Sequence, residues 1–443
     1  MALDLTRGAV WRVIPAFALP LLVGNLTQQV YNLTDSVIVG RFLGKEALAA
    51  VSASFFIYYF IISLAIGVGS GITVVVSQRF GARDHEAVQR AFSSFLLFAL
   101  VAGAVLSVVG VVGADGFFRL TQTPPEVMPY ALRYFRVYAA GTLFFILFYS
   151  ALSILRGIGD SVRPMHFVLT TAVLNIAFDL LFILVFRWDI EGAAAATILA
   201  QACGVALAVR HIRRHELLSL RRGDLVFDRP LFLLGVRIGI PTGVQQCAIA
   251  IGLVALLGIV NGFGADTLTA YGAAGKIDSF IVQIILTLSG ALSAFCGQNI
   301  GAGRLDRVHA GVRFAMLFNV SLCLVVLAAI LAFGRQMMGA FTEDAAVVAI
   351  GQEYLTILGA VLVFHGALCI LNGAMRGAGD TLFAMTTGIV SFWLIRIPLA
   401  TLFSRTWGRV GIWWAIAASI TLAFIATLIY YRTGRWKRRV GNG

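Results

Sequence analysis

The chain has 443 residues, of which 59% are hydrophobic and only 12% are charged, and its mean hydropathy is +0.90. Soluble domains carry about 25% charged residues, so this composition excludes an ordinary soluble protein and indicates that much apolar surface faces lipid. A membrane-spanning helix needs about 20 apolar residues. The length therefore has room for about twelve spans with their loops and for little else.

Twelve apolar runs follow one another along the chain, separated by charged turns or turns that contain Gly or Pro. The runs are continuous rather than alternating, which indicates helices and not the strands of a barrel. We predict spanning helices at 13–40, 46–77, 88–113, 128–155, 164–187, 191–211, 231–262, 266–297, 308–334, 346–374, 382–404 and 409–431. The predicted fold is an all-α polytopic membrane protein with an amino-terminal six-helix lobe (1–212), a cytoplasmic linker (213–230) and a carboxy-terminal six-helix lobe (231–443).

The basic residues give the expected orientation. The formal net charge is +13, and most Lys and Arg residues lie in the segments that share a side with both termini, such as the linker and the run Arg435–Arg439. Basic residues gather in cytoplasmic loops, so we expect a multi-pass protein of the bacterial inner membrane with both termini in the cytoplasm. The excess charge then serves topology and contact with membrane lipids, and we expect no nucleic-acid partner.

The sequence contains an internal duplication. Three short matches share one constant shift along the chain, pairing 43–50 with 263–270, 78–82 with 298–302, and 156–161 with 376–381. A weaker match, shifted by one position more, pairs Pro20 with Pro241. Each unit has six spans, so the two are parallel repeats, which we expect to enclose a central cleft and to work by alternating access.

Several segments together resemble the multidrug and toxic compound extrusion (MATE) transporters. They are Gln29–Gly40, Gly192–Thr197, Gln298–Gly303 and the doubled Gly-x-Gly-Asp turns at Gly157–Asp160 and Gly377–Asp380. The chain is most similar to the DinF-like branch. The resemblance implies a secondary antiporter that exports organic cations and amphipathic drugs in exchange for H⁺ or Na⁺, with no cofactor, and we expect a monomer.

Two acidic residues stand out inside the predicted spans. An ionisable side chain in a span costs several kcal/mol unless it is paired or solvated, so Asp35 and Asp179 are functional candidates. The resemblance implies that they converge on a cation-coupling pocket with Tyr31, Asn175 and Thr197. Two close carboxylates cannot both ionise cheaply, so one takes up a proton, or both share Na⁺ with Asn175 and Thr197. The structural alternative is that Asp35 stabilises a kinked helix.

The carboxy-terminal repeat lacks this acidic pair. At the constant shift of the repeat Asp179 aligns with Leu399, and one position further along Asp35 aligns with Leu256. Family members of the NorM type carry acids in helices seven and ten, where this chain has Gln245, Gln246 and His365, which tilts the expectation toward H⁺. The sequence leaves two roles open for His365 and for Arg396: each either lines the substrate cleft, where His365 could also titrate, or is structural.

Pro20 is the candidate gating residue. It lies fifteen residues before Asp35, and the family resemblance places a helix-one proline beside the cation site. Proline frees a backbone carbonyl and permits bending. We hypothesise that protonation of the acids changes the bend of the first helix and releases the drug. The alternative is a kink that stays fixed through the cycle.

Two other functions compete with drug antiport. A lipid-linked oligosaccharide flippase shares the architecture, but its pyrophosphate ligand calls for several basic residues in the cleft, and two deep acids favour cations instead. A membrane-embedded enzyme needs an exposed catalytic constellation. The inferred outer loops are short and carry none, so we expect no catalytic residues.

Overall fold

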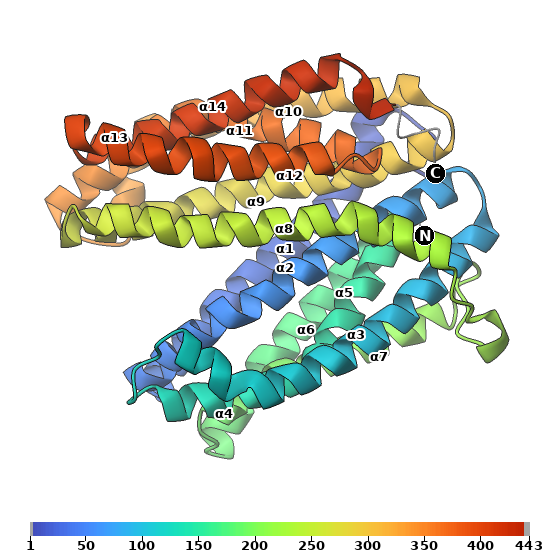
Figure 1. Ribbon diagram of the computed structural model, residues 1–443, viewed down its shortest axis with the longest axis horizontal. Coiled ribbons are helices and arrows are strands. Elements are labelled where there is room, and N and C mark those ends of the chain that lie inside the picture. Colours follow the sequence, from blue (N-terminus) through green and yellow to red (C-terminus); the bar gives the residue numbers. More distant parts are fainter. Residues whose placement is uncertain (1–2, 438–443) are drawn as a thin grey trace. The chain divides into compact units, whose positions relative to one another are not determined.

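The structure is a computed structural model that describes residues 3–437, apart from the side chains of Phe56 and Arg222. Over this range it contains helices and no strands (Figure 1). The elements of the first half are α1 (Val10–Phe42), α2 (Lys45–Gly81), α3 (His85–Leu120), α4 (Met128–Ala140), α5 (Thr142–Gly157), α6 (Val162–Leu180), the π-helical segment η1 (Leu181–Val185) and α7 (Ile190–Ile212). Arg438, Arg439 and the rest of the predicted carboxy-terminal lobe beyond 437 lie outside the described residues.

The second half repeats this order. After the short 3-10 helix η2 (Arg222–Asp224) follow α8 (Arg229–Asn261), α9 (Ala265–Gly301), α10 (Leu305–Gly339), α11 (Ala345–Gly377), α12 (Leu382–Ile389), the π-helical segment η3 (Val390–Arg396), α13 (Ile397–Trp407) and α14 (Arg409–Arg432).

The number of spans agrees with the predicted number. Within residues 3–437, eleven helices are long and apolar enough to cross a membrane, and a bent pair brings the number up to twelve. The pair is α4 and α5, which meet at an angle of 48°. The bend falls at Gly141, where a Cβ atom would lie 2.2 Å from the side chain of Ile198. The predicted all-α fold with twelve spans in two repeats is confirmed.

The chain folds into two compact units. Ala16–Ile240 form the body of the first unit, and the second comprises Leu5–Pro15 together with the chain from Pro241 onward. The division therefore falls inside α1 and inside α8, not in a loop. The lobe boundaries at 212 and 230 were drawn from loops in the sequence, and they stay a prediction.

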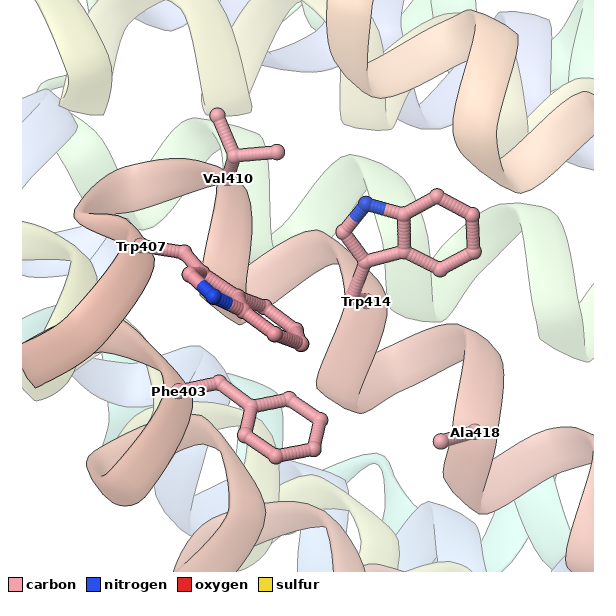
Figure 2. A pocket seen from close by; sticks show the side chains of 5 residues that line it. All are labelled: Phe403, Trp407, Val410, Trp414 and Ala418. Atoms are coloured by element: carbon pink, nitrogen blue, oxygen red, sulfur yellow. The ribbon is translucent and has the colours of Figure 1, made fainter.

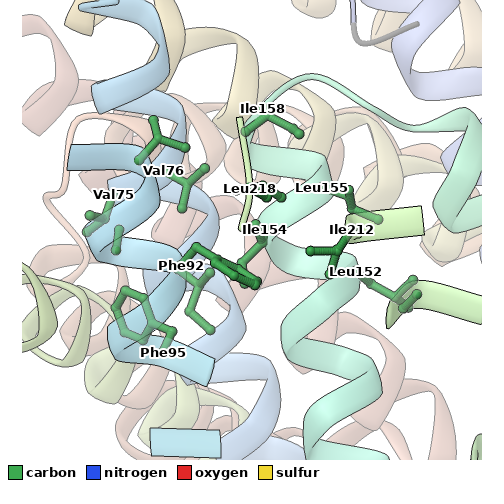
Figure 3. Packing of buried hydrophobic residues seen from close by; sticks show 14 of the residues in the cluster. Val75, Val76, Phe92, Phe95, Leu152, Ile154, Leu155, Ile158, Ile212 and Leu218 are labelled. Carbon is green, nitrogen blue, oxygen red and sulfur yellow. The ribbon is translucent and has the colours of Figure 1, made fainter. Parts of the chain in front are cut away.

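The first unit is held by apolar side chains that the spans turn toward one another. Phe92 and Phe95 of α3 are at most 1% exposed and pack with Ile154 and Leu155 of α5 in one cluster (Figure 3). Lipid is as apolar as these side chains, so the cluster stabilises the unit through close packing rather than through exclusion of water.

The second unit shows how small residues permit this packing. Gly373 and Gly377 lie one helical turn apart on α11, and a Cβ atom at either would come within 2.5 Å of a backbone oxygen of α9, at Ser289 or Ser293. Only glycine allows the two helices to approach so closely.

The repeated turns have the same local geometry in both units. Gly159 and Gly379 have φ values of 87° and 83°, a left-handed conformation that favours glycine. Asp160 accepts a hydrogen bond from the Arg163 backbone N–H at 3.0 Å, and Asp380 accepts one from the Tyr430 hydroxyl at 2.6 Å. These contacts support a structural role for the doubled motif.

Candidate cation-coupling site

The two acidic residues predicted from the sequence meet in the first unit. Asp35 lies on α1 one turn after Tyr31, and Asp179 lies on α6 one turn after Asn175, so each helix presents a polar pair on one face. The carboxyl groups of Asp35 and Asp179 interact directly with each other. Asp179 is 0% exposed and Asp35 is half-buried.

The carboxyl pair is short of hydrogen-bond donors. Within the described part of the chain, no N–H or O–H group donates to Oδ1 of Asp35 or to either carboxylate oxygen of Asp179. Most buried charges in proteins are paired with donors or opposite charges, because an unpaired one is expensive in a low dielectric. A positive charge or a proton would therefore stabilise this pair.

Asn175 and Thr197 extend the acceptor surface. The side-chain amide of Asn175 donates to Oγ1 of Thr197 at 3.2 Å, and Thr197 donates to the backbone oxygen of Ala193 at 3.2 Å. Both residues are at most 5% exposed. Since the amide nitrogen is turned toward Thr197, Oδ1 of Asn175 is left without a donor among the described residues. A third acceptor therefore joins the two carboxylates.

Phenol rings surround these acceptors, and sequence reasoning found only Tyr31 among them. Tyr31 and Tyr134 each interact electrostatically with both Asp35 and Asp179. Tyr138 stacks on Tyr134 with ring centroids 5.6 Å apart and meets the edge of Tyr58 at 4.3 Å. These rings give the site flat apolar walls with polar tips.

One sequence signal could have found the missed tyrosines. Tyr130, Tyr134 and Tyr138 follow one another at four-residue spacing in α4, which places them on one face of the helix.

A change of helix type follows the acidic residue of α6. The π-helical segment η1 begins two residues after Asp179, and the Phe186 N–H donates five residues back to Leu181 at 3.0 Å. Such segments occur frequently at functional sites, because the wider turn shifts the side chains that follow. Here it lies in the same span as the donor-poor carboxyl pair.

Besides the tyrosines, the oxygen-bearing side chains of the site are Asp35, Asp179, Asn175 and Thr197. In residues 3–437 no group of three or more His, Cys, Asp or Glu side chains is placed to hold a metal. Na⁺ would depend on Asp35, Asp179 and Asn175 with Thr197, whose hydroxyl already takes part in two hydrogen bonds.

Pro20 is separated from the acids along the first helix. α1 runs unbroken from Val10 to Phe42, so the fifteen residues between Pro20 and Asp35 span about 22 Å at 1.5 Å per residue. The family resemblance implies a proline beside the cation site, but Pro20 lies well away from the carboxyl pair along α1. Any effect of Pro20 on the pair must therefore pass through the helix. Its gating role stays a prediction.

The other predicted cleft residues belong to the second unit. Gln245 donates from Nε2 to the backbone oxygen of Ala384 at 3.0 Å, and Gln246 beside it is half-buried. His365 on α11 is half-buried and interacts electrostatically with Arg396. Arg396 ends η3, and its Nε donates to Oγ of Ser419 at 2.9 Å.

An apolar groove of the second unit lies apart from this chemistry. Figure 2 shows its lining, which comes from α13 and α14: Phe403, Trp407, Val410, Trp414 and Ala418. Trp407 and Trp414 are about half exposed, as is usual for tryptophans near a membrane interface. None of the predicted site residues lines the groove.

Comparison with known families finds the duplication again. A family model described as MatE matches the chain twice, over residues 20–181 and 241–402. The two matches are equally long, so the second repeats the first at one constant shift. Together they cover well over half of the chain, and they begin at Pro20 and Pro241.

Individual relatives match over nearly their whole length. The chain is 32% identical to the "Probable multidrug resistance protein YpnP" of Bacillus subtilis and 29% identical to the "Probable multidrug resistance protein YoeA" of the same organism, each over 98% of the chain and at least 96% of the relative. A solved structure described as the outward-facing conformation of a multidrug resistance MATE family transporter of the MOP superfamily has a TM-score of 0.92 at 25% identity, covering 99% of this chain and 98% of that one.

We predict that Asp179→Asn leaves the thermal stability of the detergent-solubilised protein unchanged or raises it. The carboxylate is fully buried without a donor, so neutralising it removes an unfavourable charge. The comparison variant is Asp344→Ala, because Asp344 caps α11 by accepting from the Ala346 N–H at 2.8 Å, and its loss should cost about 1 kcal/mol. A larger fall in melting temperature for Asp179→Asn than for Asp344→Ala would mean that Asp179 is a structural residue.

Proposed function

Because the chain belongs to the MatE family, we propose that it is a secondary active antiporter that exports organic cations and amphipathic drugs in exchange for H⁺. The members of this family and the relatives described above are transporters, so the chain is not an enzyme. It is a multi-pass membrane protein. We further propose the bacterial inner membrane as its location, with both termini in the cytoplasm and the monomer as the working unit.

The observation that carries this proposal is the carboxyl pair with too few donors. Asp35 and Asp179 contact each other inside candidate membrane spans, and no described donor satisfies the oxygens of Asp179. Two carboxylates that close cannot both hold a full negative charge in a low dielectric. The pair needs a proton in one state and gains from an organic cation in another, which is the requirement for exchanging the two.

The surroundings of the pair support a cation with a flat apolar body. Tyr31 and Tyr134 interact with both acids, and the rings of Tyr58 and Tyr138 continue the wall. Aromatic faces attract cations and pack against planar rings. Binding of the cationic drug and protonation of Asp35 or Asp179 would then compete for the same negative charge. In proteins with two such repeats, alternating access exposes a site first to one side of the membrane and then to the other.

H⁺ is favoured over Na⁺ as the coupling ion. A proton needs only one carboxylate oxygen, whereas a hard metal cation needs a full shell of oxygen ligands. In residues 3–437 no third acidic side chain, histidine or cysteine joins the carboxyl pair to complete such a shell.

We predict that Asp35→Asn abolishes uncoupler-sensitive ethidium transport by everted membrane vesicles. The variant keeps the size and polarity of the side chain but removes the group that exchanges a proton. The matched control is Asp115→Asn, since Asp115 lies in a span yet is partly exposed and pairs with Arg119 at 2.7 Å. Normal transport by Asp35→Asn at equal expression would contradict the assignment. Absence of any ethidium transport by the wild type would instead favour the flippase alternative.

The proposed gating role of Pro20 requires that α1 bends with protonation. We expect spin labels at Val37 on α1 and Val173 on α6, both well exposed positions, to change their separation between acidic and alkaline pH. A label pair at Val105 on α3 and Val173 serves as the control that does not report on α1. Equal distances at both pH values for the first pair would indicate that the bend is fixed and would refute the gating role.

A further inference from the structure

The second unit has a polar cluster near the positions that correspond to the coupling site of the first. At the shift that pairs 156–161 with 376–381, Tyr134 corresponds to Tyr354 and Tyr58 corresponds to Asp278. At the same shift Asn175 corresponds to Ile395, the residue directly before Arg396. Arg396 ends the π-helical segment η3.

The acids of the first unit, Asp35 and Asp179, have the apolar counterparts Leu256 and Leu399. The second unit therefore carries its charged residues, Asp278 and Arg396, at positions of its own.

Arg396 lies near the middle of a candidate span and has no ion-pair partner among residues 3–437. The span runs from Leu382 to Trp407, and no carboxylate in the described chain lies within 4.0 Å of the Arg396 guanidinium nitrogens. The guanidinium instead stacks over Phe392, 4.2 Å from the ring centroid. A charged arginine at this depth is expensive, so its retention points to a function.

The contacts of Arg396 orient it and leave its terminal nitrogens available. Nε donates to Oγ of Ser419 at 2.9 Å, and the Ser391 hydroxyl donates to the backbone oxygen of Ser419 at 2.8 Å, so η3 and α14 are tied together around the guanidinium. Nη1 and Nη2 donate to no acceptor among the described residues, and neither is sealed from the surface of the unit. Two parallel N–H groups on a fixed plane match a carboxylate in bidentate geometry.

The neighbours of Arg396 define the rest of the ligand. Asp278 and Tyr271 of α9 both interact electrostatically with Arg396. Tyr271 stacks on Trp413 with centroids 5.7 Å apart and planes 4° from parallel. The negative charge of Asp278 repels a ligand that is only an anion. A ligand that binds Arg396 through a carboxylate therefore also needs a positive group to interact with Asp278. The rings supply an apolar wall.

From this cluster we infer that Arg396 binds the carboxylate of zwitterionic amphipathic compounds, which the protein carries in addition to simple organic cations. The inference rests on the proposed export function for its biological meaning. The binding site itself does not depend on proton coupling. Asp278 is placed to balance the positive group of such a ligand, and Phe392 and Ser419 position the guanidinium.

The test is equilibrium binding of two matched dyes to the purified protein in detergent, with no ion gradient. One dye is a xanthene with a free carboxylate, which is a zwitterion, and the other is its methyl ester, which is a cation. Arg396→Gln should weaken binding of the carboxylate dye about tenfold or more and should change binding of the ester less than about twofold. Arg396→Lys keeps the positive charge but loses the two parallel N–H groups. Its affinity for the carboxylate dye should therefore lie between the affinities of the wild type and of Arg396→Gln.

Controls separate recognition from folding. Arg405 is exposed on α13, so Arg405→Gln should leave the binding of both dyes unchanged. Equal weakening of both dyes by Arg396→Gln would show a structural role and overturn the inference, as would unchanged binding of the carboxylate dye. If Arg396→Gln does not fold, the wild type decides: an unlabelled aromatic carboxylic acid amphipath must displace the carboxylate dye better than its own methyl ester does, and equal displacement overturns the inference.

The outcome is separable from that for antiport. Efflux that does not depend on Asp35, together with dye binding that depends on Arg396, would refute the proposed function and leave this binding site standing. Efflux that depends on Asp35, together with dye binding that is unchanged by substitution of Arg396, would support the proposed function and refute this binding site.

Discussion

The structure of this protein depends on one constraint, which is the free-energy cost of an unsatisfied charge inside a membrane. Lipid offers no donors and no counter-ions, so every carboxylate or guanidinium in a span must be neutralised by protein, proton or ligand. Asp179 is completely buried beside Asp35, yet no described donor reaches its oxygens. Proteins retain such an arrangement where the missing positive charge arrives from outside. In the proposed function a proton satisfies the pair in one state and an organic cation satisfies it in another.

The two repeats carry clusters of different charge. The first unit surrounds two acids with phenol rings, and the second surrounds Arg396 and Asp278 with Tyr271, Tyr354 and Trp413. In both units a π-helical segment lies in the span that carries the key polar residue. In our proposals the first site exchanges cations and the second binds ligands that carry both signs.

The features that depend on composition and periodicity could be predicted from the sequence. The contacts between side chains of different helices could not. The spans were predictable because continuous apolar runs of sufficient length have one solution in lipid, and Asp35 and Asp179 were predictable because acids in such runs are rare. Tyr58, Tyr134 and Tyr138 were missed because tyrosine in a span is unremarkable until its neighbours are known. The role of Arg396 stayed open because its contacts with Phe392 and Ser419 depend on how η3 and α14 pack. The division of the units inside α1 and α8 was hidden because the apolar runs continue across it.

The most direct measurement is drug efflux from proteoliposomes in which H⁺ and Na⁺ gradients are imposed separately, with the wild type and Asp179→Asn compared in the same preparation. If the carboxyl pair exchanges a proton for the drug, an H⁺ gradient alone drives efflux by the wild type, a Na⁺ gradient alone does not, and Asp179→Asn responds to neither. Efflux that follows the Na⁺ gradient alone, or H⁺-driven efflux that survives in Asp179→Asn, would contradict a proton-exchanging carboxyl pair.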